Sequence, residues 1–462
     1  MERTTVEDIV RATGGTLLAG SLETPVENVS IDSRVMKGGD LFVPLIGARS
    51  DAHDYLGQAI ENGAVAVLSE REMEPLFGAA WIRVENTLKA LQAVGKDYRE
   101  RLGIPVVGIT GSVGKTTTRE MTAAALGAGY SVFKTSKNFN SDIGLPVTMT
   151  EMGEKHELAV LEMGMSDFGE METLSSLAEP AVAVITNIGV AHIEQLGTRE
   201  NIFKEKLKIA SSMKPGGTLI LNGDDEYLRT VPKTCGFKRI FYGFGETCDF
   251  RAEAVETRAD GTAFTAVYGD EQVRVSLPVM GRHMVMDALA ALAAAVTQGI
   301  SMERAAKALA DFSGFKNRQQ IYRLSGFTMI DDTYNASPDS MRAALMVLSG
   351  METSGKRVAV LADMMELGEE TGRFHRETGR FAAGLSLDCL VCIGELAKEI
   401  GAGFLEGISG KKNSDEAQVH FFVSGETALP FLKTLAGDQN LMLLKGSNAM
   451  KLSQTAAALR EQ

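Results

Sequence analysis

A glycine-rich segment at residues 108–118, Gly-Ile-Thr-Gly-Ser-Val-Gly-Lys-Thr-Thr-Thr, constrains the fold more than any other part of the sequence. It overlaps the end of an apolar run at 104–110 and precedes a stretch that predicts a helix. Glycines at a strand–helix junction let backbone N–H groups surround a phosphate, and the helix N-terminus adds positive potential. At this spacing Lys115 can reach the β- and γ-phosphates of a nucleotide, and the Thr116 hydroxyl can ligate Mg²⁺. The match is to GxxGK[ST] only, since Ile109 stands where the longer phosphate-loop pattern has glycine.

Apolar, β-branched runs recur along the chain and alternate with stretches that predict helices. They lie at 104–110, 158–162, 182–186, 218–221 and 240–242, and again at 327–331, 358–361, 389–393, 421–423 and 441–444. Such runs are typical of parallel strands that helices cover on both faces. Residues 249–280 alternate polar and apolar around turn signals at Asp260-Gly261 and Gly269-Asp270. This pattern predicts a small antiparallel lobe.

The length of 462 residues indicates about three domains, at about 150 residues each. We expect an α/β protein that begins with a small N-terminal α/β domain at 1–82. A central domain at 83–313 would hold the glycine-rich loop, a mostly parallel sheet and the antiparallel lobe. A C-terminal, Rossmann-like doubly wound domain would occupy 314–462.

The charge balance bears on partners and location. With 47 Lys and Arg against 60 Asp and Glu, the net charge is −13, which argues against binding to nucleic acid or anionic membrane. The first residues lack a signal-peptide pattern, and the apolar stretches are too short to cross a bilayer. Cys389 and Cys392 form a CxxC inside an apolar run, which indicates a buried strand rather than a redox pair. We expect a cytoplasmic monomer that binds small molecules, with no nucleic acid partner and no membrane insertion.

Polar residues follow several of the predicted strands, where ligands bind in open α/β sheets. Glu162 suits Mg²⁺, because a hard cation prefers oxygen ligands. His192 alone fits a structural role as well as substrate binding. Asn222 could contact an adenine edge, but Asn-Gly-Asp-Asp is also a common turn. The charged stretch at 198–209 is typical of a solvated helix face.

A pair of carboxylates, Asp331-Asp332, ends a predicted strand of the C-terminal part. They could bind a ribose or a ligand amine. The residues that follow also fit a helix start, with Ser337 as N-cap and Pro338 at the first helical position. Both interpretations can hold together.

The ordered set of motifs resembles the Mur ligases, the ATP-dependent amide-forming enzymes of peptidoglycan precursor synthesis. General family features lie at 111–117, 162–164, 187–189 with His192, and Lys206 before Asn222. More specific features lie at 31–34, 39–42, 138–140, 143–146, 332–336, 363–368 with His375, and 445–447. They extend over nearly the whole chain.

The resemblance implies a two-step reaction. ATP would phosphorylate the terminal carboxylate of UDP-N-acetylmuramoyl-tripeptide, and the amine of D-alanyl-D-alanine would attack the acyl phosphate. The alternatives are another Mur-type ligase that adds a single amino acid, a folylpolyglutamate synthetase, or a nucleotide-binding regulator that has lost catalysis.

The resemblance also implies roles for individual residues. The catalytic residues would be Lys115, Lys206, His192 and Glu162, with Lys206 aligned to a lysine that is carbamylated in relatives. ATP would be bound by Thr110, Gly111, Ser112, Val113, Gly114, Lys115, Thr116, Thr117, Asn222, His283, Arg318 and Asp332. Mg²⁺ would be held by Thr116, Glu162 and His192. The other substrates would contact Ser33, Arg34, His53, Asn138, Asn335 and Ser337.

The sequence departs from the family at a few positions. Met284 and Asp287 stand where asparagines are common, and Asn448 stands where arginine is usual. These departures concern the expected contacts with adenine and with the dipeptide. Because the phosphate and metal residues are intact, we expect an active enzyme.

Overall fold

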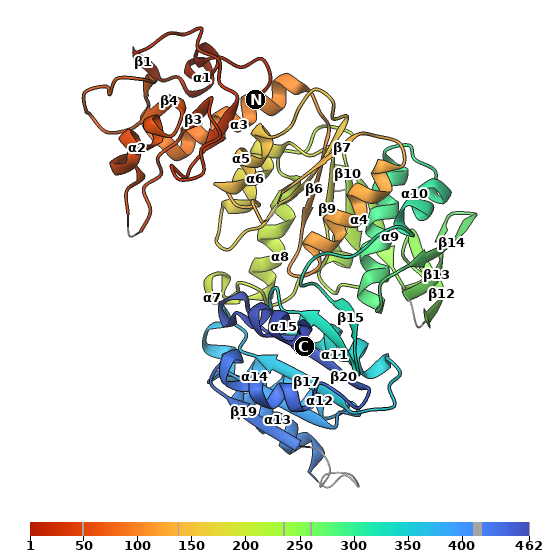
Figure 1. Ribbon diagram of the computed structural model, residues 1–462. Helices are drawn as coiled ribbons and strands as arrows, with labels where there is room; N and C mark the ends of the chain where they lie inside the picture. Colours follow the sequence, from red (N-terminus) through yellow and green to blue (C-terminus); the bar gives the residue numbers. More distant parts are fainter. Residues whose placement is uncertain (49, 137, 234–235, 259–260, 410–417, 462) are drawn as a thin grey trace.

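The computed structural model describes residues 1–462 apart from 49, 137, 234–235, 259–260, 410–417 and 462. Three β-sheets follow one another along the chain, each with its own helices (Figure 1). We refer to them as the N-terminal, central and C-terminal units. The mixed, mostly parallel architecture confirms the predicted α/β fold class.

The N-terminal unit is a five-stranded sheet of order β1-β5-β4-β3-β2, parallel except for β1. Its elements are α1 (Val6–Thr13), β1 (Thr16–Ala19), β2 (Asn28–Ser30), β3 (Asp40–Phe42), α2 (Leu56–Glu61), β4 (Ala64–Ser69) and β5 (Ala80–Arg83). Helix α3 (Thr87–Leu102) packs against both α1 and α5, so it joins this unit to the next. The Asn86 side chain caps the start of α3, and Gly103, with φ of 65°, ends it.

The central unit is a nine-stranded sheet of order β14-β13-β12-β11-β10-β9-β6-β8-β7. Its strands are β6 (Val106–Thr110), β7 (Val132–Lys134), β8 (Leu158–Glu162), β9 (Val182–Ile185), β10 (Thr218–Asn222), β11 (Lys238–Gly243), β12 (Phe250–Arg258), β13 (Gly261–Tyr268) and β14 (Glu271–Leu277). Strands β12 to β14 are the predicted antiparallel lobe, although Asp260 of its first turn signal lies outside the described residues. The lobe is an extension of the parallel sheet, since β12 pairs in parallel with β11.

Helices cover both faces of the central sheet. They are α4 (Lys115–Gly127), α5 (Gly144–Thr150), α6 (Glu170–Ala178), α7 (Ile193–Leu196), α8 (Arg199–Leu207), α9 (Arg282–Thr297) and α10 (Met302–Leu309). Alternate residues of β6 point to opposite faces: Val107 and Ile109 pack with α4 and α9, whereas Val106 packs with α5 and α6. Both faces are therefore buried, as the continuous apolar runs predict.

The C-terminal unit is a six-stranded sheet of order β15-β16-β20-β17-β18-β19, parallel except for β15. Its strands are β15 (Gln320–Leu324), β16 (Phe327–Asp332), β17 (Arg357–Ala362), β18 (Cys389–Ile393), β19 (Gln418–Phe422) and β20 (Asn440–Lys445). Its helices are α11 (Pro338–Gly350), α12 (Thr371–Ala382), α13 (Lys398–Ile408), α14 (Gly425–Thr434) and α15 (Leu452–Arg460). Apolar clusters on both faces confirm a doubly wound sheet. Cys389 and Cys392 lie buried in β18 as free thiols, as predicted.

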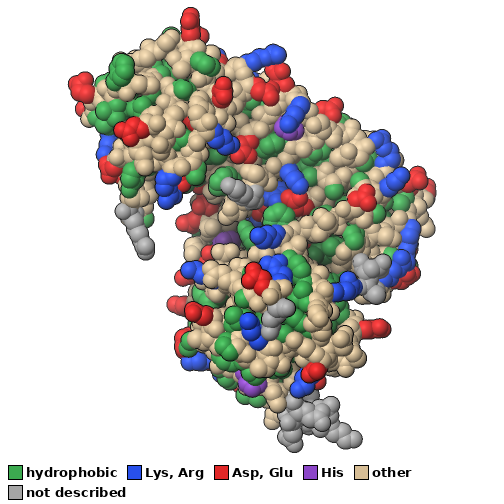
Figure 2. Space-filling view, viewed as in Figure 1, with side chains coloured by type: hydrophobic (Ala, Val, Ile, Leu, Met, Phe, Trp, Pro, Cys, Tyr) green, Lys and Arg blue, Asp and Glu red, His purple; other side chains and the backbone are tan. Residues whose placement is uncertain are grey.

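Figure 2 shows a hollow between the N-terminal unit and the rest of the molecule. Acidic and basic side chains are interspersed over this face, and the basic ones do not gather into one patch. No helix in the described part of the chain is long and apolar enough to cross a bilayer.

Candidate active site

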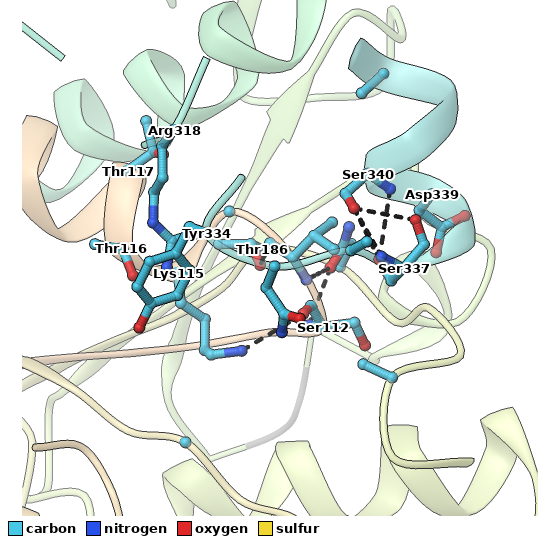
Figure 3. Close-up of a pocket in the computed structure, with 18 of the residues that line it drawn as sticks. Ser112, Lys115, Thr116, Thr117, Thr186, Arg318, Tyr334, Ser337, Asp339 and Ser340 are labelled. Carbon is cyan, nitrogen blue, oxygen red and sulfur yellow. Dashed lines mark hydrogen bonds between the residues drawn. The ribbon is translucent and has the colours of Figure 1, made fainter. Parts of the chain in front are cut away.

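A cavity of about 580 Å³ lies where the carboxyl ends of the central strands face the C-terminal unit. Its central wall includes the glycine-rich loop and the ends of β8, β9 and β10. Residues there include Ser112, Val113, Gly114, Lys115, Thr116, Thr117, Asn138, Asn140, Glu162, Asn187, His192, Asn222, His283 and Asp287. The opposite wall includes Arg318, Asp332, Tyr334, Asn335, Ser337, Asp339, Glu366 and Lys445. Figure 3 shows side chains from both walls facing one space.

The glycine-rich loop joins β6 to α4, and its glycines are required by the backbone and by close neighbours. Gly111 and Gly114 have φ of 151° and 84°. A Cβ on Gly111 would collide with the Thr186 side chain, and one on Gly114 would lie 2.9 Å from Asp287 Oδ1. The segment that follows β9 supports the loop, because Asn187 Oδ1 accepts hydrogen bonds from the amides of Ser112 (3.1 Å) and Val113 (2.9 Å).

Lys115 begins α4 and folds back over the loop. Its Nζ donates to the carbonyl oxygens of Gly111, at 2.9 Å, and Ser112, at 3.4 Å. Burial lowers the pKa of this ammonium group, and Arg318 nearby lowers it further. Two cations converging on one cavity repel each other, so the arrangement favours an anionic ligand.

Glu162, at the end of β8, is the buried carboxylate of the loop region. Its Oε2 accepts a hydrogen bond from Thr116 Oγ1 at 2.9 Å and contacts Arg119 Nη1 at 3.1 Å, while Oε1 accepts from Asn140 Nδ2 at 2.8 Å. The hydroxyl and the carboxylate are thus adjacent. Within the described residues, no group of three or more His, Cys, Asp or Glu side chains could hold a metal ion by itself.

His192 reaches the cavity from the N-cap position of α7. Its Nδ1 lies 2.8 Å from Glu366 Oε2, which belongs to the C-terminal unit. This contact lowers the pKa of the Glu366 carboxyl.

Lys206 and Glu205, on α8, are buried. The composition-based interpretation of this helix as a solvated face is therefore wrong for these two residues. Glu205 Oε1 accepts a hydrogen bond from the Gly169 amide at 2.8 Å, so it caps α6. The Lys206 side chain makes no hydrogen bond or ion pair with any described residue, and burial, together with the charge of Lys115, holds the pKa of its amine well below the usual range.

Asn222, at the end of β10, lines the cavity, but its amide is already used. Nδ2 donates to the Thr186 carbonyl oxygen at 2.9 Å, and Oδ1 accepts from the Asp224 amide at 3.0 Å. Its contact with adenine stays a prediction.

Arg318 and His283 also line the cavity, Arg318 on the opposite wall and His283 on the central wall. The Arg318 guanidinium stacks on Tyr334, with Cζ 3.9 Å from the ring centroid, and its Nε has no hydrogen-bond partner in the described part of the chain. Burial lowers the pKa of His283, which favours its neutral form. A flat stacked cation and a neutral imidazole are both suited to contacting a nucleotide.

Asp332, at the end of β16, is engaged by Lys445 at the end of β20. Lys445 Nζ lies 2.6 Å from Asp332 Oδ2 and also donates to the Asn335 carbonyl oxygen at 2.9 Å. Asp332 Oδ1 accepts from the Gln319 amide at 3.1 Å. These contacts fix the segment that carries Asn335 and Ser337 toward the cavity.

Comparison with known proteins extends this picture. The Mur ligase family catalytic domain matches residues 25–99, the Mur ligase middle domain 109–295, and the Mur ligase glutamate ligase domain 317–448. The UDP-N-acetylmuramoyl-tripeptide–D-alanyl-D-alanine ligase of Bacillus subtilis is 40% identical over 100% of this chain and 99% of its own. The chain belongs to the Mur ligase family.

Solved structures agree with this assignment. MurF from Acinetobacter baumannii superposes with a TM-score of 0.90 at 31% identity, covering 99% of both chains. MurF ligase from Thermotoga maritima in complex with ADP gives a TM-score of 0.82 at 30% identity, covering 94% of this chain and 97% of that one.

The N-terminal residues singled out from the sequence lie outside this cavity of the Mur ligase. Ser33 Oγ donates to Gln58 Oε1 at 2.9 Å, and the exposed Arg34 pairs with Asp32. His53 is buried, with Nδ1 2.6 Å from Asp51 Oδ1. Thr110 and Gly111 also do not line the cavity.

Several residues around the site of this Mur ligase were missed as site residues by sequence reasoning. Asn187 supports two loop amides, Arg119 pairs with Glu162, and Asp339 lines the cavity at the start of α11. Asn187 and Lys445 belong to the motifs at 187–189 and 445–447, so the sequence does contain a signal for these two residues. Arg119 and Asp339 occupy helix positions where charged residues are ordinary, so nothing local distinguishes them.

Proposed function

We propose that this enzyme joins D-alanyl-D-alanine to UDP-N-acetylmuramoyl-tripeptide at the expense of ATP, in peptidoglycan precursor synthesis. The observation that carries the proposal is the 40% identity, over the whole length, to a ligase of that name. The geometry supports it, because a phosphate-binding loop on the central wall faces polar groups of the C-terminal wall across one cavity. The Thermotoga relative was solved with ADP.

Each substrate is assigned to one part of the chain. The segment 1–82 would bind the UDP-sugar around Ser33, Arg34 and His53, 83–313 would bind ATP, and 314–462 would bind the dipeptide. The polar groups facing the cavity from the start of α11 support the last assignment. The enzyme would act as a monomer in the cytoplasm.

The reaction has two steps. A carboxylate oxygen of the tripeptide attacks the γ-phosphorus, and the bond to the ADP oxygen breaks, giving an acyl phosphate. The nitrogen of the neutral amine then attacks the acyl carbon and loses one proton, and phosphate leaves with the C–O electron pair. Lys115 and Arg318 would stabilise the transferring phosphoryl group, since positive charge fixed in place lowers the barrier to phosphoryl transfer.

The residues beside Lys115 fit Mg²⁺. Thr116 Oγ1 and Glu162 Oε2 are oxygen donors 2.9 Å apart, and Mg²⁺ commonly takes one or two protein ligands plus nucleotide phosphates and water. Arg119 shares the same carboxylate and would compete for it. Bound Mg²⁺ would neutralise phosphate charge. His192 would face a second cation together with Glu366.

Lys206 is proposed to carry a carbamate. Burial lowers the pKa of Lys206, which favours the neutral amine, and a neutral amine can attack carbon dioxide. The product is an oxygen-rich anion near Lys115.

A phosphate-release assay tests the function. Phosphate and an amide product should form only when ATP, the UDP-muramoyl-tripeptide and D-alanyl-D-alanine are all present, with either lysine or diaminopimelate as the third residue. Single amino acids, or folate with glutamate, should not replace the substrates. Absence of the amide product with the full set would falsify the proposal.

A further inference from the structure

Six carboxylates line the cavity in the described part of the chain, and five of them contact a partner. These five are Glu162, Glu170, Asp287, Asp332 and Glu366. The sixth, Asp339, forms no hydrogen bond or ion pair with its side chain among the described residues. It therefore presents a carboxylate to the cavity that the folded chain does not use.

Asp339 is the second residue of α11, in the C-terminal unit, yet it meets the central unit. A Cβ placed on Gly189 would collide with Asp339 Oδ2 and would lie 3.2 Å from Ser112 Cβ. The carboxylate thus abuts the Asn187–Gly189 segment next to the phosphate loop. Figure 3 shows Asp339 at the start of α11, with Ser337 and Ser340 beside it and Ser112 and Lys115 across the space.

The charges around Asp339 leave it poorly compensated. Arg199 of α8 and Arg342 of α11 face it, as does the acidic Asp225. Arg199 is engaged by Glu226 and the Ile188 carbonyl oxygen, and Arg342 lies 3.9 Å from Glu377. Asp339 is exposed to the cavity, so a ligand can reach its carboxylate, and the protein atoms around it raise the pKa of this carboxyl by partial burial.

An uncompensated carboxylate beside a phosphate loop repels phosphate, so by itself it works against nucleotide binding. It becomes favourable when a cation enters the same space. The amide-forming reaction brings one, because the amino group of the dipeptide is an ammonium ion in neutral solution. That ammonium must lose a proton before its nitrogen can attack.

We propose that Asp339 binds the ammonium group of the incoming D-alanyl-D-alanine and accepts the proton that it loses. One N–H bond of the ammonium breaks, the proton goes to a carboxylate oxygen of Asp339, and the freed lone pair of nitrogen forms the C–N bond to the acyl carbon. A second proton then passes from this nitrogen to the departing phosphate, which leaves a neutral amide. Phosphate leaves with the C–O electron pair. This assignment rests on the proposed function and deepens it.

A helix start offers a simpler role for the same residue, since acids in the first turn stabilise a helix. The chain contains a matched case. In α14, Ser424 is the N-cap of a capping box and Glu426 is the second helical residue, as Ser337 and Asp339 are in α11. Glu426 does not line the cavity. The Glu426→Gln variant therefore controls for loss of a helix-start charge.

The test compares two nucleophiles on Asp339→Asn, Glu426→Gln and the unaltered enzyme. One is D-alanyl-D-alanine, and the other is hydroxylamine, which is uncharged at neutral pH and traps the acyl phosphate as a hydroxamate. For Asp339→Asn we expect kcat/KM for the dipeptide to fall by about 10²-fold or more, as for a lost proton acceptor. Hydroxamate formation should stay within about twofold of the unaltered enzyme, and Asp339→Glu should recover part of the dipeptide activity.

The outcomes separate the two proposals. If Asp339→Asn retains full dipeptide activity, or loses hydroxamate formation to the same degree, the role of Asp339 is overturned. If the unaltered enzyme forms hydroxamate but no amide with D-alanyl-D-alanine, the proposed function fails instead. Full activity of Glu426→Gln with both nucleophiles supports the assignment, and a parallel loss in that variant contradicts it.

Discussion

His192 Nδ1 lies 2.8 Å from Glu366 Oε2, and this ion pair joins the central unit to the C-terminal unit across the cavity. Both residues have φ of 63°, in the left-handed region that costs a non-glycine residue about 1 kcal/mol. The contact is therefore made by two residues whose backbones are both strained. Strain of this kind concentrates at functional sites, where neighbouring structure holds it in place.

Replacing Glu366 should loosen the contact between the central and C-terminal units while changing the stability of the fold only slightly. Its side chain is 57% exposed, so Glu366→Gln should change the free energy of unfolding by less than about 1 kcal/mol. The radius of gyration without ligands, measured by small-angle scattering, should increase. Because His192 lowers the pKa of Glu366, the stability that the Glu366 carboxylate contributes is present above the unfolded pKa of glutamate and is lost as pH falls through the lower folded pKa. Glu369→Gln, nearby on the same loop, should leave the radius unchanged, and an unchanged radius in Glu366→Gln would contradict the link.

Removing the Lys115 ammonium should abolish turnover without unfolding the protein. Among the described residues, its Nζ donates hydrogen bonds only to carbonyl oxygens of its own loop. We expect Lys115→Ala to lower kcat by at least about 10²-fold, the size of effect seen when one fixed electrostatic donor is lost. The rise in melting temperature on adding ADP should shrink as well. Lys398→Ala, at an exposed position, is the control, and a Lys115→Ala enzyme with normal kcat would show that this lysine does not stabilise the phosphoryl group.

The carbamate on Lys206 can be tested by chemical rescue. Lys206→Ala should lose most activity, and formate or acetate should restore part of it by placing a carboxylate in the space left behind. Added bicarbonate should not help, because no amine remains to react. Lys204→Ala is a matched control, since Lys204 is on the same helix, 64% exposed, and paired with Glu200. Full activity of Lys206→Ala would refute the carbamate.

Much of the fold could be predicted because the signals are local. A parallel strand with both faces buried gives a continuous apolar run, as at β6 and β18, and a glycine-rich turn such as Gly111–Gly114 needs backbone angles that few residues adopt. Strand order is not local. Residues 250–258 lie in the predicted antiparallel lobe, but the sequence does not show that β12 pairs in parallel with β11. This pairing extends the central sheet and covers an edge that would otherwise be open.

The site was harder to predict, because the sequence does not show which polar atoms the fold already uses. Asn222 and His53 have the right chemistry for ligand binding, yet their side chains bond to neighbours within the chain. The helix with Lys206 has the composition of a solvated surface, and only tertiary packing buries that residue. Asp339 shows the reverse: an ordinary helix-start acid by sequence faces the cavity in the structure.

Asp287 gives the enzyme a pH-dependent stability. It is buried on α9, where the family commonly has asparagine, and its Oδ1 accepts a hydrogen bond from Thr118 Oγ1 at 2.8 Å. Burial raises its pKa from 3.8 to about 7. Between these two values the folded protein keeps a proton that the unfolded chain has released. Stability therefore falls as pH rises from about 4 to about 7, and the loss is complete above the folded pKa.

Asp287→Asn should remove this dependence, because the asparagine carbonyl can accept the same hydrogen bond without becoming charged. We expect equal free energies of unfolding for the two proteins near pH 4, and a gain for the variant at pH 8 with an upper limit of about 4 kcal/mol, at about 1.4 kcal/mol per pKa unit. Urea unfolding of both proteins at both pH values measures the difference in their free energies of unfolding. The titration of all other groups is the same in the two proteins and cancels in this difference. The exposed Asp311→Asn should show no such trend. A gain that does not grow with pH would mean that Asp287 is ionised in the folded protein throughout, and that Thr118 and Arg318 stabilise its charge.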